Sequence, residues 1–212
     1  MTFQKGYLYH IYNQGNNHQK IFLNRENYLF FLGKMKSYIL SYGDFLAWCL
    51  MPNHFHFMVR VNEVELPVGK SQGLTLSQTL TTTGTSSEAL TFRSLNASIG
   101  ILLRSYTRAI NKQQMSSGSI FRQKTKAECL NDPTGVTPAY FMKNGITHIN
   151  ITNPERQYPQ VCFDYIHQNP VKAKLAKLPT DWEFSSARDY AGTRDGILVN
   201  KEVAREYVKV TR

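Results

Sequence analysis

The chain has 212 residues, 42% of them hydrophobic, so it is long enough to bury the core of one domain. Its 25 Lys and Arg residues outnumber its 15 Asp and Glu residues; the net charge of +10 favours a polyanionic partner over a small acidic metabolite. The sequence lacks an apolar run of about 18 residues, a signal-peptide core and a CxxC pair, so we expect a reduced, cytoplasmic protein without a membrane span.

The first part of the chain predicts a strand, a helix and two further strands. Residues 7–13 are rich in aromatic and β-branched side chains, which is typical of a strand. From the suitable N-cap Asn24 to residue 42, apolar side chains recur at helical spacing, which predicts an amphipathic helix. Strands are expected at residues 45–50 and 54–61, joined by a tight turn.

The middle of the chain departs from this pattern. Half of residues 71–94 are Ser or Thr, so we expect an insertion at residues 63–94. A helix is predicted at residues 95–111, followed by a strand at residues 120–130. Three basic residues alternate onto one face of that strand and are expected to bind DNA phosphates: Arg122, Lys124 and Lys126.

The last part of the chain predicts a second insertion at residues 131–158, then a helix that follows Pro159. This helix should end at Asn169, because a proline disfavours the helical conformation of the residue before it. Residues 179–212 are expected to extend the domain formed by residues 1–178. The order of elements predicts an α+β fold, an antiparallel sheet with helices packed on one face.

Two histidines alternate with two phenylalanines at the start of the predicted strand 54–61. The period of two places His54 and His56 on one face of the strand, with Phe55 and Phe57 on the other. Two neutral imidazoles on one surface can hold a divalent metal when a third protein ligand joins them. The alternative is a half-exposed strand with two surface histidines, since His-x-His is a common pattern.

A second pair of residues lies near the end of the last long helix. Tyr165 and Asn169 are four positions apart and therefore neighbours on one helical face. A phenol beside an amide suits a nucleophile beside a metal ligand, because a divalent cation can polarise a scissile phosphate. The alternative is a tyrosine that packs half-buried on an amphipathic helix.

Together these segments resemble the single-tyrosine HUH transposases, and within them the REP-associated tyrosine transposases. The similarity covers most of the chain and is carried by four segments: residues 9–17 (YHIYNQGNN), 49–56 (CLMPNHFH), 120–124 (IFRQK) and 165–173 (YIHQNPVKA). The string Met-Pro-Asn-His-Phe-His, followed later by Tyr-Ile-x-x-Asn-Pro-Val, is far more specific than His-x-His alone.

The resemblance implies a ferredoxin-like HUH endonuclease fold and a metal-dependent nuclease that nicks and joins single-stranded or hairpin DNA during DNA transposition or recombination. It implies that His54, His56 and Asn169 bind Mg²⁺ or Mn²⁺, with Gln168 as an alternative third ligand. It also implies that Tyr165 is the nucleophile and forms a 5′-phosphotyrosine link. Such a protein is either a transposase or a domesticated relative, and relatives include both monomers and homodimers.

Two other functions are compatible with the same residues. A non-catalytic protein that binds single-stranded DNA or hairpins could retain the fold, although the intact His54 and Tyr165 argue against it. A structural zinc site that uses both motif histidines and Cys49 lacks a fourth ligand. Four further histidines are expected in packing or surface roles, of which the first could reach the metal through strand pairing: His10, His18, His148 and His167.

Overall fold

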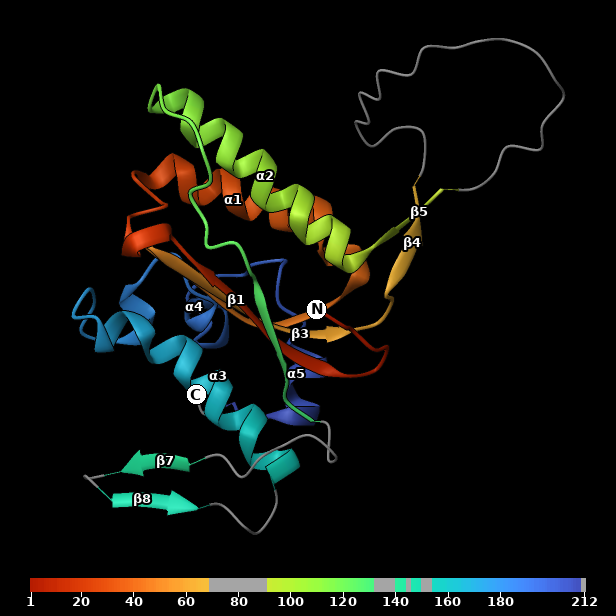
Figure 1. The fold of residues 1–212 in the computed structure, drawn as a ribbon. Helices are drawn as coiled ribbons and strands as arrows, with labels where there is room; N and C mark the ends of the chain where they lie inside the picture. Colours follow the sequence, from red (N-terminus) through yellow and green to blue (C-terminus); the bar gives the residue numbers. More distant parts are fainter. Residues whose placement is uncertain (69–90, 132–139, 144–145, 150–153, 211–212) are drawn as a thin grey trace, which may run out of the picture.

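An antiparallel four-stranded sheet, with the strand order β2-β3-β1-β6, lies at the centre of the computed structural model (Figure 1). Its strands are β1 (Leu8–Gln14), β2 (Gly43–Met51), β3 (His54–Val61) and β6 (Lys126–Cys129). The helices α1 (Arg25–Tyr38) and α2 (Leu95–Gln113) complete the β-α-β-β-α-β order of a ferredoxin-like fold, so the predicted α+β class is confirmed. The structure describes residues 1–68, 91–131, 140–143, 146–149 and 154–210.

Helices α1 and α2 cover one face of the sheet. Residues 55 and 57 of β3 and residue 11 of β1 point to this face and pack against both helices. Phe31 of α1 lies in the centre, with Phe55 at 5.4 Å and Tyr106 of α2 at 4.9 Å between ring centroids. Both helices begin at side-chain caps, where Asn24 and Ser94 accept hydrogen bonds from backbone N–H groups of the first turn.

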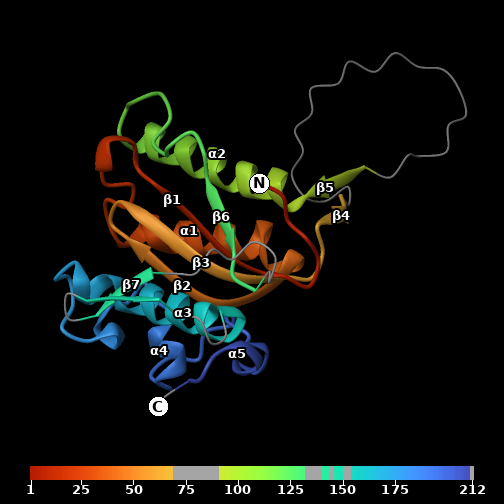
Figure 2. The same cartoon turned by 60° about the horizontal axis from the view of Figure 1, so that its bottom comes forward.

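The opposite face packs against α3 (Pro154–Lys172), and the short helices α4 (Ala187–Tyr190) and α5 (Lys201–Tyr207) lie on the same side (Figure 2). Leu8 and Met58 of the sheet contact a second apolar cluster that includes Cys162 and Ile166 of α3. The expectation of helices on one face therefore holds for α1 and α2, while an apolar patch on the other face attracts α3. The structure has three layers, and α3 forms the third.

Two element boundaries differ from the sequence-based expectation. The helix predicted after Pro159 spans Pro154–Lys172 and continues past Pro170. Ile166 is fully buried against the sheet, and this tertiary packing overrides the local bias before proline; within the helix, the Asn169 side chain also donates a hydrogen bond to the Tyr165 carbonyl at 2.9 Å.

The strand predicted at residues 120–130 is ordered as a strand only at β6, although Phe121 makes an isolated bridge to Gly15. The Asn13 side chain replaces part of the missing ladder, because its Nδ2 atom donates to the Arg122 carbonyl and to the Thr125 hydroxyl. The segment before β6 is therefore held beside β1 by these side-chain hydrogen bonds together with a backbone bond from Arg122 N–H to the Gln14 carbonyl.

The two predicted insertions are described only in part. The first is closed at its base by an antiparallel pair, β4 (Glu65–Pro67) and β5 (Phe92–Ser94), and residues 69–90 lie outside the described residues. The second contains the antiparallel pair β7 (Tyr140–Lys143) and β8 (Ile146–Ile149). Short 3-10 helices occur at Asn16–His18, Leu40–Tyr42 and Pro179–Asp181.

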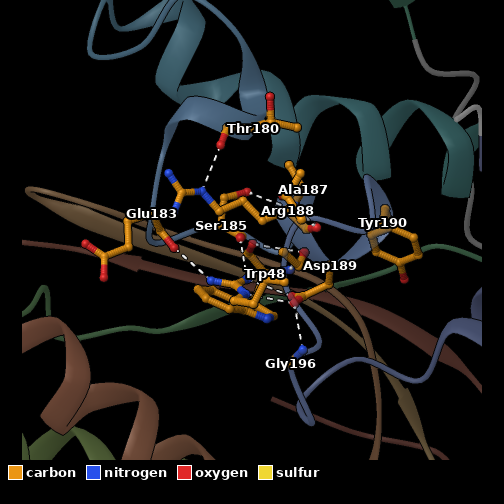
Figure 3. A network of polar contacts seen from close by, with 12 residues as sticks. Trp48, Thr180, Glu183, Ser185, Ala187, Arg188, Asp189, Tyr190 and Gly196 are labelled. Carbon is orange, nitrogen blue, oxygen red and sulfur yellow. Dashed lines mark hydrogen bonds and ion pairs between the residues drawn. The ribbon is translucent and has the colours of Figure 1, made fainter.

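The segment after residue 179 is fastened to β2, an edge strand of the sheet. Trp48 donates its backbone N–H to the Ser186 hydroxyl at 2.9 Å, and Cys49 forms a bridge with Ser185. Asp189 is 1% exposed; it accepts the Gly196 N–H and pairs with Arg194 at 2.7 Å (Figure 3). Covering an edge strand in this way protects its unpaired backbone groups.

Candidate active site

Side chains from β3 and α3 converge on the face of the sheet that packs against α3, called here the site face. The imidazoles of His54 and His56 lie 5.0 Å apart between ring centroids, and the Tyr165 ring lies 5.3 Å from that of His56. The alternation along β3 thus places both imidazoles on one face, as predicted, with Phe55 and Phe57 in the core on the other.

The last turn of α3 brings an amide to the same point. Asn169 is buried; its Nδ2 atom donates to the Tyr165 carbonyl at 2.9 Å, and its amide is near enough to influence the pKa of both the His54 imidazole and the Tyr165 phenol. The neighbouring Gln168 is exposed and lines a cavity beside Tyr165. The structure therefore brings together His54, His56, Tyr165 and Asn169, and it favours Asn169 over Gln168 as the amide of this group.

One observation indicates that these side chains could bind a divalent metal. The Nε2 atom of His56 is buried and finds no hydrogen-bond partner among the described residues. An orphaned buried imidazole nitrogen is costly unless something else coordinates it. Among the described residues, no three His, Cys, Asp or Glu side chains are placed to hold one metal ion together, so a third protein donor would have to be of another type, such as the amide oxygen of Asn169.

The electrostatic environment keeps both imidazoles neutral. Burial lowers the pKa of His54, and it lowers the pKa of His56 well below its usual value, with a further contribution from the neighbouring His10 and His54. Neutral imidazoles retain the lone pairs that a metal needs. Burial raises the pKa of the Tyr165 phenol, and the hydrogen bond with Asn169 partly offsets this, so the phenol is protonated at neutral pH.

A cavity of about 550 Å³ opens beside Tyr165. Lys172 places its Nζ atom 5.2 Å from the centre of the Tyr165 ring, and Lys126 places its own 5.7 Å from that of Tyr12. The Tyr12 hydroxyl donates to Glu128 at 2.6 Å. Tyr165 itself is 39% exposed and lines this cavity, so a ligand in the cavity can contact it.

The three predicted DNA-binding residues are exposed, as expected, but only Lys126 belongs to a strand. Arg122 approaches His18 at 3.4 Å. Lys124 lies between Arg122 and Lys126 in the chain. Lys126 faces the site directly, because it pairs with Tyr12 in the register of β1 and β6.

The remaining histidines divide as follows. His167 is buried and hydrogen-bonds Ser186 at 2.7 Å, whereas His18 is exposed, so the packing and surface roles expected of them are confirmed. His148 lies in β8, and its side chain is outside the described residues. His10 is buried with its Nε2 atom 2.9 Å from the His56 Nδ1 atom, a contact that the sequence suggested only as an option of strand pairing.

Cys49 does not join the site as a metal ligand. It lies opposite His56 in the register of β2 and β3, on the same face of the sheet. Burial raises the pKa of its thiol, and a hydrogen bond with Ser185 opposes this effect. No three His, Cys, Asp or Glu side chains among the described residues are placed to hold one metal ion, which disfavours the structural-zinc alternative.

The chain matches no protein-family model, and no curated protein matches it. It is similar in structure to a REP-associated tyrosine transposase bound to a REP hairpin, with a TM-score of 0.50 and 15% sequence identity. The match covers 91% of this chain and 83% of that one. The chain has the fold of a tyrosine transposase. No helix in the described part of this transposase fold is long and apolar enough to cross a membrane.

Proposed function

We propose that this protein is a metal-dependent single-stranded DNA endonuclease and strand transferase, acting in DNA transposition or recombination. The observation that carries the proposal is the convergence of two neutral imidazoles, an amide and a half-exposed phenol on the site face of a tyrosine transposase fold. These side chains come together within one chain.

His54, His56 and Asn169 would hold Mg²⁺ or Mn²⁺, which suits the nitrogen and oxygen donors present. When bound, the metal supplies electrostatic polarisation of the scissile phosphate and charge neutralisation beside it. The orphaned Nε2 atom of His56 supports this assignment, because a ligand there would satisfy a buried nitrogen.

Tyr165 would act as the nucleophile. Its oxygen forms a bond to phosphorus while the bond from phosphorus to the 3′-oxygen breaks, which leaves a 5′-phosphotyrosine and a free 3′-hydroxyl. The phenolic proton passes to solvent, and the departing oxygen takes up a proton. The link conserves the energy of the phosphodiester, so attack by a 3′-hydroxyl can reverse the step and join strands without a nucleotide cofactor.

The substrate would be single-stranded or hairpin DNA. Arg122, Lys124 and Lys126 would contact its phosphates beside the site, and the structural relative is bound to a hairpin. The cavity beside Tyr165 is large enough for a nucleotide next to the cleaved bond. Lys172, above the Tyr165 ring, adds positive charge where the phosphate would lie.

The test compares the wild type with His54→Ala and His56→Ala on end-labelled hairpin oligonucleotides in Mg²⁺. Both variants should lose cleavage, whereas DNA affinity should stay nearly unchanged because it is spread over many basic contacts. Cleavage by either variant at the wild-type rate would refute the metal assignment. Wild-type binding without any cleavage would instead favour the non-catalytic DNA-binding alternative.

A further inference from the structure

Each of the two candidate metal-binding imidazoles is held through its Nδ1 atom by a dedicated partner. Asn53 Oδ1 lies 2.6 Å from the Nδ1 atom of His54, and His10 Nε2 lies 2.9 Å from the Nδ1 atom of His56. We propose that His10 is a positioning residue that sets the tautomer of His56 and thereby strengthens divalent-metal binding, as Asn53 does for His54. The inference rests on the proposed function, because it assumes a metal between the two imidazoles.

The Asn53 amide has a defined orientation. Its Nδ2 atom donates to the His18 carbonyl at 3.3 Å, so its Oδ1 atom faces His54. A carbonyl oxygen can only accept, so the proton of a neutral His54 sits on Nδ1 and the lone pair is on Nε2. His54 is thereby set as a ligand before any metal arrives.

The contact between His10 and His56 allows two arrangements. If His10 donates, the proton of a neutral His56 sits on Nε2, which is buried without an acceptor among the described residues. A buried donor without an acceptor is destabilising, and a metal cannot bind a protonated nitrogen. If His10 accepts, His56 carries its proton on Nδ1, and its Nε2 lone pair is free for a metal. A metal on Nε2 would satisfy this buried atom only in the second arrangement, so His10 as the acceptor sets the tautomer that a ligand needs.

The His10 ring is fixed in place by its surroundings. It is 8% exposed, stacks on Tyr12 with 4.7 Å between centroids, and meets the edge of Tyr165 at 6.1 Å. Because its Nε2 atom faces His56, that atom is not available as a ligand. His10 therefore acts through His56, and a residue that merely fills space would not need a nitrogen at this position.

The experiment measures Mn²⁺ affinity of the full chain without DNA, from the free-ion signal in electron paramagnetic resonance. His10→Phe keeps a ring of similar shape but removes the acceptor, and it should weaken Mn²⁺ binding roughly 10- to 100-fold. His10→Gln places an amide oxygen near the former Nε2 position, and it should bind Mn²⁺ within about threefold of wild type. A residue with only a packing role would show no rescue by Gln.

Nitrogen-15 NMR of the metal-free protein gives a second measurement that does not depend on a folded variant. The wild-type His56 ring should be protonated at Nδ1 and unprotonated at Nε2. Protonation at Nε2 would overturn the proposal, and so would equal Mn²⁺ affinity in wild type and His10→Phe. The variant His56→Ala distinguishes a failure of the proposed His10 role from a failure of the proposed metal site. Unchanged Mn²⁺ binding in that variant would refute the metal site of the proposed function itself.

Discussion

At the scale of single residues, Asn169 decides how the site is completed. Its side chain is buried, donates to the Tyr165 carbonyl and influences the pKa of His54, whereas the adjacent Gln168 is exposed on the cavity wall. The Asn169 amide could therefore coordinate a metal beside the proposed nucleophile. The Gln168 amide would instead contact a ligand in the cavity.

The two amides make a matched pair for mutation. Asn169→Ala should weaken Mn²⁺ binding and slow DNA cleavage by at least about tenfold, because it removes the proposed third ligand and a hydrogen bond to the Tyr165 carbonyl. Gln168→Ala should change both quantities by less than about twofold, as expected of an exposed side chain. The reverse result would show that Gln168 is the third ligand.

The sequence predicts part of this residue-scale picture. A period of two is enough to place His54 and His56 on one face, and a spacing of four is enough to place Tyr165 beside Asn169. The role of His10 cannot be predicted in the same way. Its contact with His56 depends on the register in which Tyr12 pairs with His56, and register is a property of two strands rather than one.

At the scale of elements, three basic residues at and just before β6 form one edge of the proposed site. Arg122, Lys124 and Lys126 are exposed, and Lys126 lies next to Tyr12 on the site face. The sequence predicts their exposure but overestimates the strand. The Asn13 side chain satisfies the Arg122 carbonyl, which a continuous ladder would have bonded through the backbone.

Replacing these three residues with Ala should weaken DNA binding across sequences. It should also flatten the salt dependence by about 0.7 log units per lost phosphate contact on single strands. A control with the same loss of charge is available on the far face of the sheet, in the α1 and α2 residues Lys34, Lys36 and Lys112. Salt titrations of hairpin binding should show the flatter slope only in the first variant. Equal slopes in both variants would place the DNA elsewhere.

The packing of α3 against the C-terminal segment depends on a neutral histidine. His167 is 7% exposed, and burial lowers its pKa to about 4. In the unfolded chain the histidine pKa is about 6.5. As the pH falls from 6.5 toward 4, His167 is therefore protonated in the unfolded chain while it stays neutral in the folded protein. The stability contributed by neutral His167 is therefore present above pH 6.5 and is lost as the solution becomes acidic.

His167→Gln tests this directly, because Gln cannot titrate but can still hydrogen-bond Ser186. Between pH 7 and pH 4.5 the variant should lose roughly 2 to 3 kcal/mol less unfolding free energy than the wild type. Urea denaturation at both pH values provides the comparison. Identical losses in the two proteins would show that His167 is already accessible to protons in the folded state.

At the scale of the whole molecule, the two faces of the sheet carry different sets of side chains. One face packs on α1 and α2 through aromatic residues, while the other holds the imidazoles and meets α3. The α+β class follows from the order of elements along the sequence. The placement of α3 does not, because it depends on the apolar patch around Met58 and on a C-terminal segment that fastens onto β2.

The central claim is that one tyrosine of the twelve in the chain attacks DNA. Tyr165 is the one beside His56 and Asn169. Tyr158 lines the same cavity about two helical turns earlier in α3. Tyr165→Phe keeps the ring and removes only the oxygen that would form the bond. The variant should therefore keep the wild-type unfolding temperature and DNA affinity.

The most direct measurement is peptide mapping, by mass spectrometry, of the covalent adduct formed with single-stranded or hairpin DNA in Mg²⁺ or Mn²⁺. The account predicts DNA attached to the peptide that contains Tyr165 in the wild type, and no adduct in Tyr165→Phe. An adduct on Tyr158 or any other tyrosine, or one that persists in Tyr165→Phe, would contradict it.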